Sequence, residues 1–312
     1  PYSYVLYPDT ELSIDNVHAA SAVGFHPGSA RPLDLRIQAD SDLQAYLSRA
    51  NIGEARDAYD ALLAHYAGRA EARYTHQGSQ LRSEGLADYR FGIESLHNAD
   101  ALQEVIPAEL LEAIPGESCK QEASVNHTAM SIRMAAHLLT HPTSPARHVT
   151  VVDGGLIPAS GGGGYDVHDL HLQDTSRNLV NTLTTLVEQI NEPGEADPSK
   201  IDLDETLIIL NTEFGRTPYQ QRGNLYGTNH HPYGYVTAMF GGPIGLEQSG
   251  ILGAIGPDGW ADRYVTPIEA RCAVLAAMGI YPFSHEAFAI GDLRDQNDER
   301  DGLVWLNEVV LG

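Results

Sequence analysis

Apolar positions recur with two different periods along the chain, and segments of the two kinds alternate. Residues 122–140 and 179–190 carry apolar side chains three and four residues apart, which is the spacing of an amphipathic helix. Short apolar runs follow them at residues 148–153 and 206–210 and indicate buried strands. A repeated helix and strand is typical of an α/β sheet with helices on both faces. The pattern therefore predicts a doubly wound, mostly parallel sheet.

The first third of the chain has a less regular pattern. Proline and glycine interrupt residues 1–38, which we expect to be extended and loop-like. Residues 40–74 place apolar side chains at helical spacing, so we expect a pair of helices there. We accordingly divide the chain into a partly helical region, 1–120, and a core α/β region, 121–312, within one continuous domain.

A further helix is marked near the end of the chain. Thr266, Pro267 and Glu269 have the spacing of an N-cap, a first-turn proline and the acidic member of a capping box. Gly279 is suited to the position just after the helix ends. We expect a short, well-bounded helix between these signals.

The chain is strongly acidic, with 42 acidic and 19 basic residues and a formal charge of −23. Nucleic acids and anionic membranes attract basic surfaces, so neither is expected as a partner. A small anionic ester substrate or a protein partner remains open, and the oligomeric state does not follow from the sequence. The sequence contains no apolar run of about 18 residues that would predict a membrane span.

The two cysteines give little support for a redox or thiolate site. Cys272 falls in an apolar helical pattern and is expected in the core, whereas Cys119 follows a glycine turn. Whether the two form a disulfide stays open. No Cys-x-x-Cys pair is present, so a thiolate zinc site is not expected.

The chain begins at Pro1 without a methionine or a signal peptide, and we expect the start of the gene product to lie upstream.

The first candidate site segment is residues 161–171. Four consecutive glycines allow the backbone to approach a ligand closely, and two carboxylates and two imidazoles follow within six residues. In an extended segment Asp166 and His168 would point the same way, and His171 would open the next helix. Carboxylate and imidazole together suit zinc, manganese or iron better than calcium. The alternative is a flexible loop followed by polar helix-start residues.

The second candidate segment is the polar loop of residues 212–235, which lies between two apolar runs. Glu213 follows the strand at 206–210 directly, and Arg216 is suited to bidentate binding of a phosphate, sulfate or carboxylate. An ion pair between these two residues is the alternative. Both candidate segments follow predicted strands, and sites in doubly wound sheets collect at the carboxyl ends of strands.

The more specific signal for a metal site in this loop is the run of Asn229, His230 and His231. Adjacent histidines cannot easily face one metal ion together. We therefore prefer His230 as the ligand and leave His231 as a supporting or an exposed residue.

Three motifs together resemble the bacterial domain-of-unknown-function family 1501. The first is the Gly-Gly-Tyr-Asp-Val-His run that ends at His168. The second is the Thr-Glu-Phe-Gly-Arg-Thr-Pro run that ends at Pro218, followed by the Gly-Thr-Asn-His run that ends at His230. The third is the Val-Thr-Pro-Ile-Glu run that ends at Glu269, followed by a Met-Gly-Ile run. Their order and spacing agree from about Glu122 to Tyr281, whereas the first 120 residues are only loosely similar.

The family looks related to the alkaline phosphatase and sulfatase superfamily. That resemblance implies a doubly wound sheet, a divalent metal site beside a hydroxyl nucleophile, and export to the periplasm or medium. Asp166 and His168 would bind one metal, Glu213 would lie beside them, and Asn229 and His230 would stand at a metal-binding Asp-His pair. Zinc, manganese and calcium are not distinguished.

The chain also departs from that superfamily pattern. Asn229 replaces an aspartate, and a neutral amide is a weaker ligand for a transition metal. The superfamily's first metal-binding aspartate and its nucleophile would precede Pro1, so no nucleophile is identified. Two hypotheses follow. One is a metal-dependent hydrolase of phosphate or sulfate esters, with Glu213 and Arg216 in the active site. The other is an exported binding or structural protein with a degenerate site and no metal.

Overall fold

The computed structural model describes residues 3–8, 32–37, 56–76, 105–116, 124–156, 164–165, 168, 171–212, 214–220, 227–244, 250–284 and 288–311. The chain separates into two compact units. The first contains Pro1–Val167, Leu172–Gln189 and Asp197–Ile201, and the second contains His168–His171, Ile190–Ala196 and Asp202–Gly312. These units differ from the expected division at residue 120, because strands from both sides of that boundary share one sheet.

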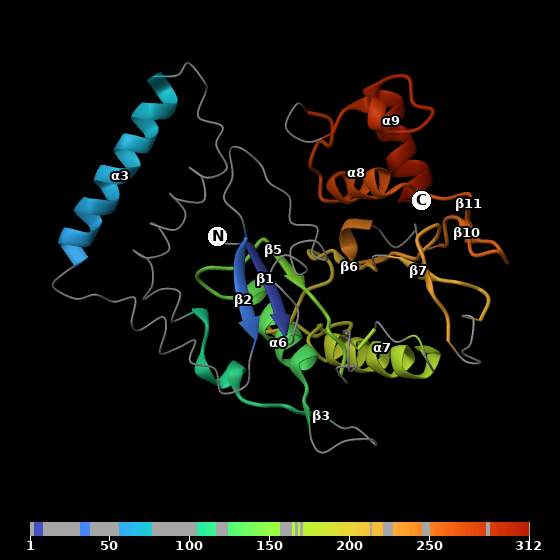
Figure 1. Ribbon diagram of the computed structural model, residues 1–312, viewed down its shortest axis with the longest axis horizontal. Helices are drawn as coiled ribbons and strands as arrows, with labels where there is room; N and C mark the ends of the chain where they lie inside the picture. Colours follow the sequence, from blue (N-terminus) through green and yellow to red (C-terminus); the bar gives the residue numbers. More distant parts are fainter. Residues whose placement is uncertain are drawn as a thin grey trace. The chain divides into compact units, whose positions relative to one another are not determined.

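The first unit is built on a three-stranded parallel sheet. Strands β1 (Ser3–Pro8), β2 (Leu33–Ile37) and β5 (His148–Val151) lie in the order β2-β1-β5, as Figure 1 shows. Three successive residues of β1, from Tyr4 to Leu6, are buried, which indicates a central strand covered on both faces. Residues 3–8 and 33–37 are thus extended, as expected, but they form strands of a sheet and not loops.

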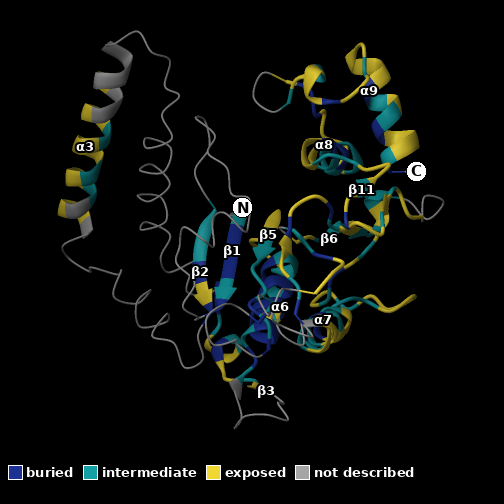
Figure 2. Cartoon of the chain, turned by 45° about the vertical axis from the view of Figure 1, so that its right-hand side comes forward, coloured by how far each residue is buried: buried dark blue, intermediate teal, exposed yellow. Residues whose placement is uncertain are grey.

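Helix α6 (His127–Thr140) packs against this sheet. Asn126 caps the helix by accepting a hydrogen bond from the backbone N–H of Ala129 at 3.0 Å. The helix begins later than the predicted residue 122, because Ser124–Val125 pair instead with Pro115–Gly116 as β4 and β3. Figure 2 shows β1 and α6 in the dark blue of buried residues. The core between them is apolar and comprises Tyr4, Leu6, Leu35, Ile37, Val105, Ile106, Leu111, Met130, Met134, Ala135, Leu138 and Ala146.

Helix α7 (His171–Glu188) begins at His171 as predicted, but it turns its polar side inward. Asn178, Thr182 and Thr185 are buried, whereas Leu179 and other apolar residues of the same helix are exposed. Two further elements that the structure describes in this part of the chain are the helix α3 (Arg56–His76) and the 3-10 helix η2 (Ala108–Leu111).

The second unit is built from antiparallel strand pairs and a helical end. The pairs are β6 (Ile208–Leu210) with β9 (Ala238–Phe240), β7 (Gly215–Arg216) with β8 (His230–His231), and β10 (Ala254–Ile255) with β11 (Ala261–Asp262). The helical elements among the described residues of this unit are η3 (Gly242–Ile244), α8 (Pro267–Ala277), η5 (Ile290–Asp292), α9 (Glu299–Trp305) and the π-helix η6 (Leu306–Val310).

These sheets are mixed in direction: the three-stranded sheet of the first unit is parallel, whereas the β3–β4 pair of that unit and the strand pairs of the second unit are antiparallel. Among the described residues no pairing joins β5 to β6, the two strands that precede the candidate site segments. The doubly wound sheet therefore stays a prediction. None of the helices that the structure describes combines the length and the apolar character needed to cross a membrane.

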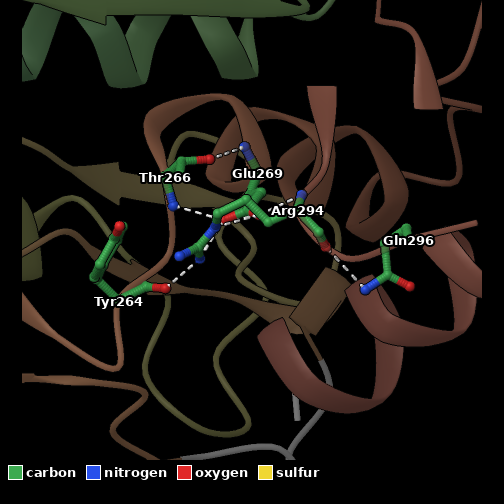
Figure 3. A network of polar contacts seen from close by, with 5 residues as sticks. All are labelled: Tyr264, Thr266, Glu269, Arg294 and Gln296. Atoms are coloured by element: carbon green, nitrogen blue, oxygen red, sulfur yellow. Dashed lines mark hydrogen bonds and ion pairs between the residues drawn. The ribbon is translucent and has the colours of Figure 1, made fainter. Parts of the chain in front are cut away.

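Helix α8 confirms the capping signals read from the sequence. The side chain of Thr266 accepts from the N–H of Glu269, and the carboxylate of Glu269 accepts from the N–H of Thr266. Gly279 follows the helix with a φ of 69°. Arg294 also binds Glu269, as Figure 3 shows.

Cys272 is buried in the core of this unit together with Ala273, Phe283, Leu293, Leu306 and Leu311.

Candidate functional site

Two histidines from distant parts of the sequence lie side by side in the second unit. The imidazole centroids of His168 and His230 are 4.9 Å apart, with the rings tilted by 39°. The backbone N–H of Thr228 donates to the carbonyl of His168 at 3.1 Å, which holds the two segments together. The structure thus brings together one candidate ligand from each of the two segments singled out in the sequence.

The 212–235 loop is closed at its base and folded back on itself. Strands β6 and β9 pair on either side of it, with Leu210 opposite Ala238. Within the loop, β7 and β8 pair so that Arg216 lies opposite His230 and Gly215 lies opposite His231. Directly opposite residues of an antiparallel pair project from the same face, so Arg216 and His230 share one face.

Phe214 lies on that same face, because alternate residues of an extended segment point the same way. Its ring is 4.3 Å from the His230 ring, centroid to centroid, at an angle of 33°. The guanidinium carbon of Arg216 is 6.0 Å from the Phe214 centroid. Phe214, which was not a candidate residue from the sequence, therefore lies next to both the imidazole of His230 and the guanidinium of Arg216.

His231 occupies the opposite face and is only 6% exposed. Its ring meets Tyr233 edge-on at 5.1 Å and Trp260 at 6.5 Å, and those two rings stack on each other at 4.0 Å. Of the two roles left open for His231, exposure is thus wrong and support is consistent with the packing. Strand alternation explains why adjacent histidines separate as the sequence analysis expected.

Three glycines permit the close backbone packing beneath this hairpin. A Cβ atom on Gly215 would collide with the carbonyl oxygen of Gly234. One on Gly234 would lie 2.9 Å from the carbonyl oxygen of Gly259, and one on Gly259 would lie 2.7 Å from the ring of His231. Three backbone segments therefore approach one another without side chains between them, which fixes the positions of β7 and β8.

Asn229 is engaged by the hairpin itself. Its backbone carbonyl accepts from the N–H of Thr217 at 3.0 Å, and its own N–H donates to the hydroxyl of Thr217 at 3.0 Å. Its side-chain oxygen accepts from the N–H of His230 at 2.9 Å. The amide oxygen proposed as a metal ligand thus already serves to orient the neighbouring histidine.

Other proposed site residues fall outside what the structure describes. Asp166, Glu213 and the side chain of His171 lie outside the described residues, as does Cys119. Among the described residues, no group of three or more histidine, cysteine, aspartate or glutamate side chains could hold a metal ion. The described part of the site therefore consists of the two imidazoles, Arg216, Phe214 and Asn229.

The donor chemistry and spacing of the two imidazoles fit a shared divalent ion. Two imidazoles bound to one tetrahedral zinc at ~2.1 Å would have centroids about 5 Å apart, close to the observed 4.9 Å. His168 and His230 could therefore supply two ligands. A complete site needs further ligands, which Asp166 or His171 would have to provide.

A second polar cluster, which the sequence analysis missed, lies in the first unit at the end of β5. The carboxylate of Asp153 accepts hydrogen bonds from Thr128 at 2.7 Å, from the N–H of Gly155 at 2.8 Å and from Tyr165 at 2.8 Å. The hydroxyl of Thr182 also donates to it. Burial and the charge of Asp153 raise the pKa of Tyr165, so this phenol stays protonated and continues to donate.

Asn178 holds together the two stems of the glycine-rich loop. Its side-chain oxygen accepts from the N–H of Leu156 at 2.9 Å, and its amide donates to the carbonyl of Gly164 at 2.6 Å. The N–H of Gly164 also donates to the carbonyl of Gly154 at 2.7 Å. The only sequence signal for these roles was the position of Asp153 at the end of a predicted strand.

Comparison with known proteins gives one match. The family described as "Protein of unknown function (DUF1501)" matches residues 4–283, which is most of the chain. No curated protein matches the chain, and no solved structure matches it. The match confirms the family resemblance read from the motifs and extends it to β1 and β2, where the motifs gave only loose similarity.

Proposed function

Because the chain belongs to the DUF1501 family, whose motifs resemble those of the alkaline phosphatase and sulfatase superfamily, we propose that it is a metal-dependent hydrolase of phosphate or sulfate esters. The observation that carries the proposal is the pairing of His168 with His230, 4.9 Å apart, on the hairpin face that also bears Arg216. Two imidazoles beside a guanidinium combine metal-ligand chemistry with oxyanion recognition.

In this proposal each residue has a separate task. His168 and His230 would hold a divalent ion together with Asp166, and His171 and Asn229 would lie beside it. The chemistry that such an ion would supply is polarisation of the ester and stabilisation of the departing oxyanion. Arg216 binds the phosphoryl or sulfuryl oxygens through its planar donors.

Phe214 and Glu213 have supporting tasks. Phe214 packs against the His230 ring and limits its rotation. Glu213 would orient Arg216 or the ester. The same family resemblance supports an exported protein, and the nucleophile is not assigned.

The proposal is tested first by metal content. The purified, metal-replete protein should contain at least one transition metal ion per chain. His168→Ala and His230→Ala should each lower that content, and Asp166→Ala should do the same. His65→Ala, on the exposed surface of α3, is the matched control and should leave it unchanged. A wild-type protein that binds no metal would contradict the proposal.

Hydrolysis of aryl phosphates and aryl sulfates is the second test. Arg216→Ala should raise KM for these anions while leaving metal content intact, because it removes substrate binding and not ion binding. Arg216→Lys should restore part of the affinity through charge but not the bidentate geometry. Activity that survives both His168→Ala and His230→Ala would place catalysis elsewhere.

A second candidate function is a non-catalytic binding or structural protein on the same fold. The observation that favours it is Asn229, whose side-chain oxygen is already bonded to the N–H of His230 where the superfamily has a ligand carboxylate. The variant Asn229→Asp separates the two functions. A degenerate site should gain metal affinity on this change, whereas a working site adapted to asparagine should lose activity.

A further inference from the structure

Helix α7 presents an apolar stripe to solvent. Leu172, Leu179, Val180 and Val187 are 74%, 43%, 62% and 67% exposed. All four fall within about 100° of the helix circumference, the width of the apolar face that a helix normally buries. Figure 2 shows exposed turns along α7. An apolar stripe of this kind on a folded protein marks an interaction surface.

The helix cannot rotate to bury this stripe in its own unit, because its other side is bound there. Asn178 bonds to Leu156 and Gly164, and the hydroxyl of Thr182 donates to Asp153. Asn181 also exchanges hydrogen bonds with Asn126 at 2.7 and 3.2 Å. Rotation would break these buried bonds, at a cost of about 1–3 kcal/mol for each polar group left unpaired.

The exposed side of α7 is almost uncharged. Of the exposed positions that the structure describes on this helix, only Glu188 carries a charge, although the whole chain has 42 acidic and 19 basic residues. Depletion of charge is typical of the buried centre of a protein–protein interface. The one arginine of the helix, Arg177, is half-buried and lies off the stripe, so nucleic acid and anionic membrane are unsuitable partners. The stripe therefore fits a protein surface that is also uncharged.

The spacing of the stripe is symmetrical, as pairing with a second copy of the same helix requires. Leu172 and Val187 lie at equal distances from the midpoint between Leu179 and Val180. We propose that α7 pairs antiparallel with α7 of a second copy across a twofold axis at that midpoint. Leu172 would then pack on Val187 of the partner subunit, and Leu179 on Val180 of the partner subunit. Such an interface is self-complementary, as a twofold axis requires.

The charge of the chain favours this face for self-association. Two copies with a formal charge of −23 each repel one another, and the uncharged side of α7 lets them meet without opposing carboxylates. The stripe spans about 22 Å of helix, which is small for an interface. We therefore expect a weak dimer that becomes tighter as salt screens the repulsion.

Sedimentation equilibrium over a wide concentration range tests the proposal. The average mass should rise from that of the 33.8 kDa chain toward twice that value, and more readily at high salt. Leu179→Glu should weaken the dimer about tenfold or more, because it places carboxylates at the axis. Thr184→Glu, at an exposed position off the stripe, is the matched control and should have little effect. A monomer at every concentration and salt would overturn the proposal.

Mixing two variants tests the register. Leu179→Glu and Val180→Lys should each dimerise poorly alone, and an equal mixture should recover association, because residue 179 of one chain faces residue 180 of the other. No rescue would overturn the antiparallel arrangement. A variant misfolded by its substitution would not be rescued by its counterpart, so circular dichroism of each variant alone accompanies the measurement.

Disulfide trapping gives an independent readout of the same register. In a Cys119→Ser background, a mixture of Leu172→Cys and Val187→Cys chains should cross-link, whereas Leu172→Cys alone should not. The remaining Cys272 is buried and would not interfere. Cross-linking of Leu172→Cys with itself would overturn the antiparallel pairing. None of these measurements requires metal or activity, so the inference and the proposed hydrolase can fail separately.

Discussion

Arg294 binds the carboxylate of Glu269 through two parallel hydrogen bonds. Its Nε donates to Oε1 at 2.9 Å and its Nη2 donates to Oε2 at 2.8 Å. Glu269 is completely buried, whereas the side chain of Arg294 is 40% exposed. The backbone N–H groups of Thr266 and Arg294 also donate to this carboxylate, at 2.7 and 3.0 Å (Figure 3). One buried acid thus joins the start of α8 to the segment after η5.

The unequal burial of the two partners predicts unequal effects of removing them. Arg294→Ala leaves a buried carboxylate without its cation and should lower the free energy of unfolding by about 3 kcal/mol. Glu269→Gln leaves only a half-exposed guanidinium, and glutamine still suits the capping box, so we expect about half that loss. Urea unfolding measures both changes. Arg271→Ala, exposed on the same helix, is the control, and equal losses for the two variants would contradict this interpretation.

The same pair predicts a pH dependence of stability. Burial alone would raise the pKa of Glu269, but hydrogen bonds from Arg294 and Thr266 outweigh it and lower the pKa from 4.5 to about 2. Because the folded-state pKa is the lower one, the stabilisation is complete above pH 4.5 and disappears as the pH falls toward 2. The shift of the pKa corresponds to at most about 3 kcal/mol, and solvent screening at the partly exposed Arg294 reduces it to about half, the loss expected for Glu269→Gln.

The measurement for this prediction is a comparison of wild type with Glu269→Gln in urea at several pH values. Other carboxylates of this acidic chain titrate in the same range, so the difference between the two proteins is the informative quantity. That difference should be constant from pH 7 to about 5 and should shrink toward pH 2. A difference that stays constant throughout would show that Glu269 is not held ionised by Arg294.

The start of α8 could be predicted from the sequence because its signals are local. Thr266 and Glu269 act on each other's backbone N–H groups within one turn, so their spacing alone implies the bonds. Arg294 is 25 residues further on, and nothing in its neighbourhood indicates its partner. The short-range half of this network was therefore predictable and the long-range half was not.

The candidate site shows the same division. The sequence marked His168, Arg216 and His230 by their chemistry, but it could not show that Arg216 lies opposite His230 or that Phe214 contacts the His230 ring. These relations depend on the register of two-residue strands, which carry no periodic signal of their own. Residue chemistry was readable from the sequence, and the contacts that each residue makes within the hairpin were not.

Helix α7 shows where periodicity alone misleads. Its apolar spacing predicts an amphipathic helix, and the structure has one. The usual inference would bury the apolar side, yet Asn178 and Thr182 are the buried residues. Their hydrogen bonds to the glycine-rich loop and to Asp153 decide the orientation. A pattern of hydrophobicity does not contain that information, because the partners lie outside the helix.

Asp153 should be the most sensitive polar position of the first unit. Its carboxylate accepts from Thr128, Gly155, Tyr165 and Thr182. Asp153→Asn replaces one acceptor oxygen by an NH₂ group that opposes those donors, and should cost about 2–4 kcal/mol in the free energy of unfolding, because buried donors lose their partners.

A matched control separates this effect from loss of charge. Asp197→Asn removes a carboxylate that accepts from Ser199 on the exposed surface, and it should change stability little. Chemical unfolding monitored by far-ultraviolet circular dichroism measures both variants. Equal effects of the two changes would mean that the bonds around Asp153 contribute nothing beyond an ordinary surface aspartate.

Gly234 should tolerate no side chain, although its backbone conformation is ordinary. A Cβ at this position would lie 2.9 Å from the carbonyl oxygen of Gly259 and 3.1 Å from the amide nitrogen of Ala261, and backbone atoms cannot move aside cheaply. Gly234→Ala should therefore push the β7–β8 hairpin away from the backbone of Gly259 and Ala261. This should increase the distance between His168 and His230. We expect altered imidazole signals in histidine-selective NMR and faster amide exchange of Thr217. Gly250→Ala, where a Cβ meets nothing within 4 Å, is the control, and identical spectra for both variants would disprove the close packing.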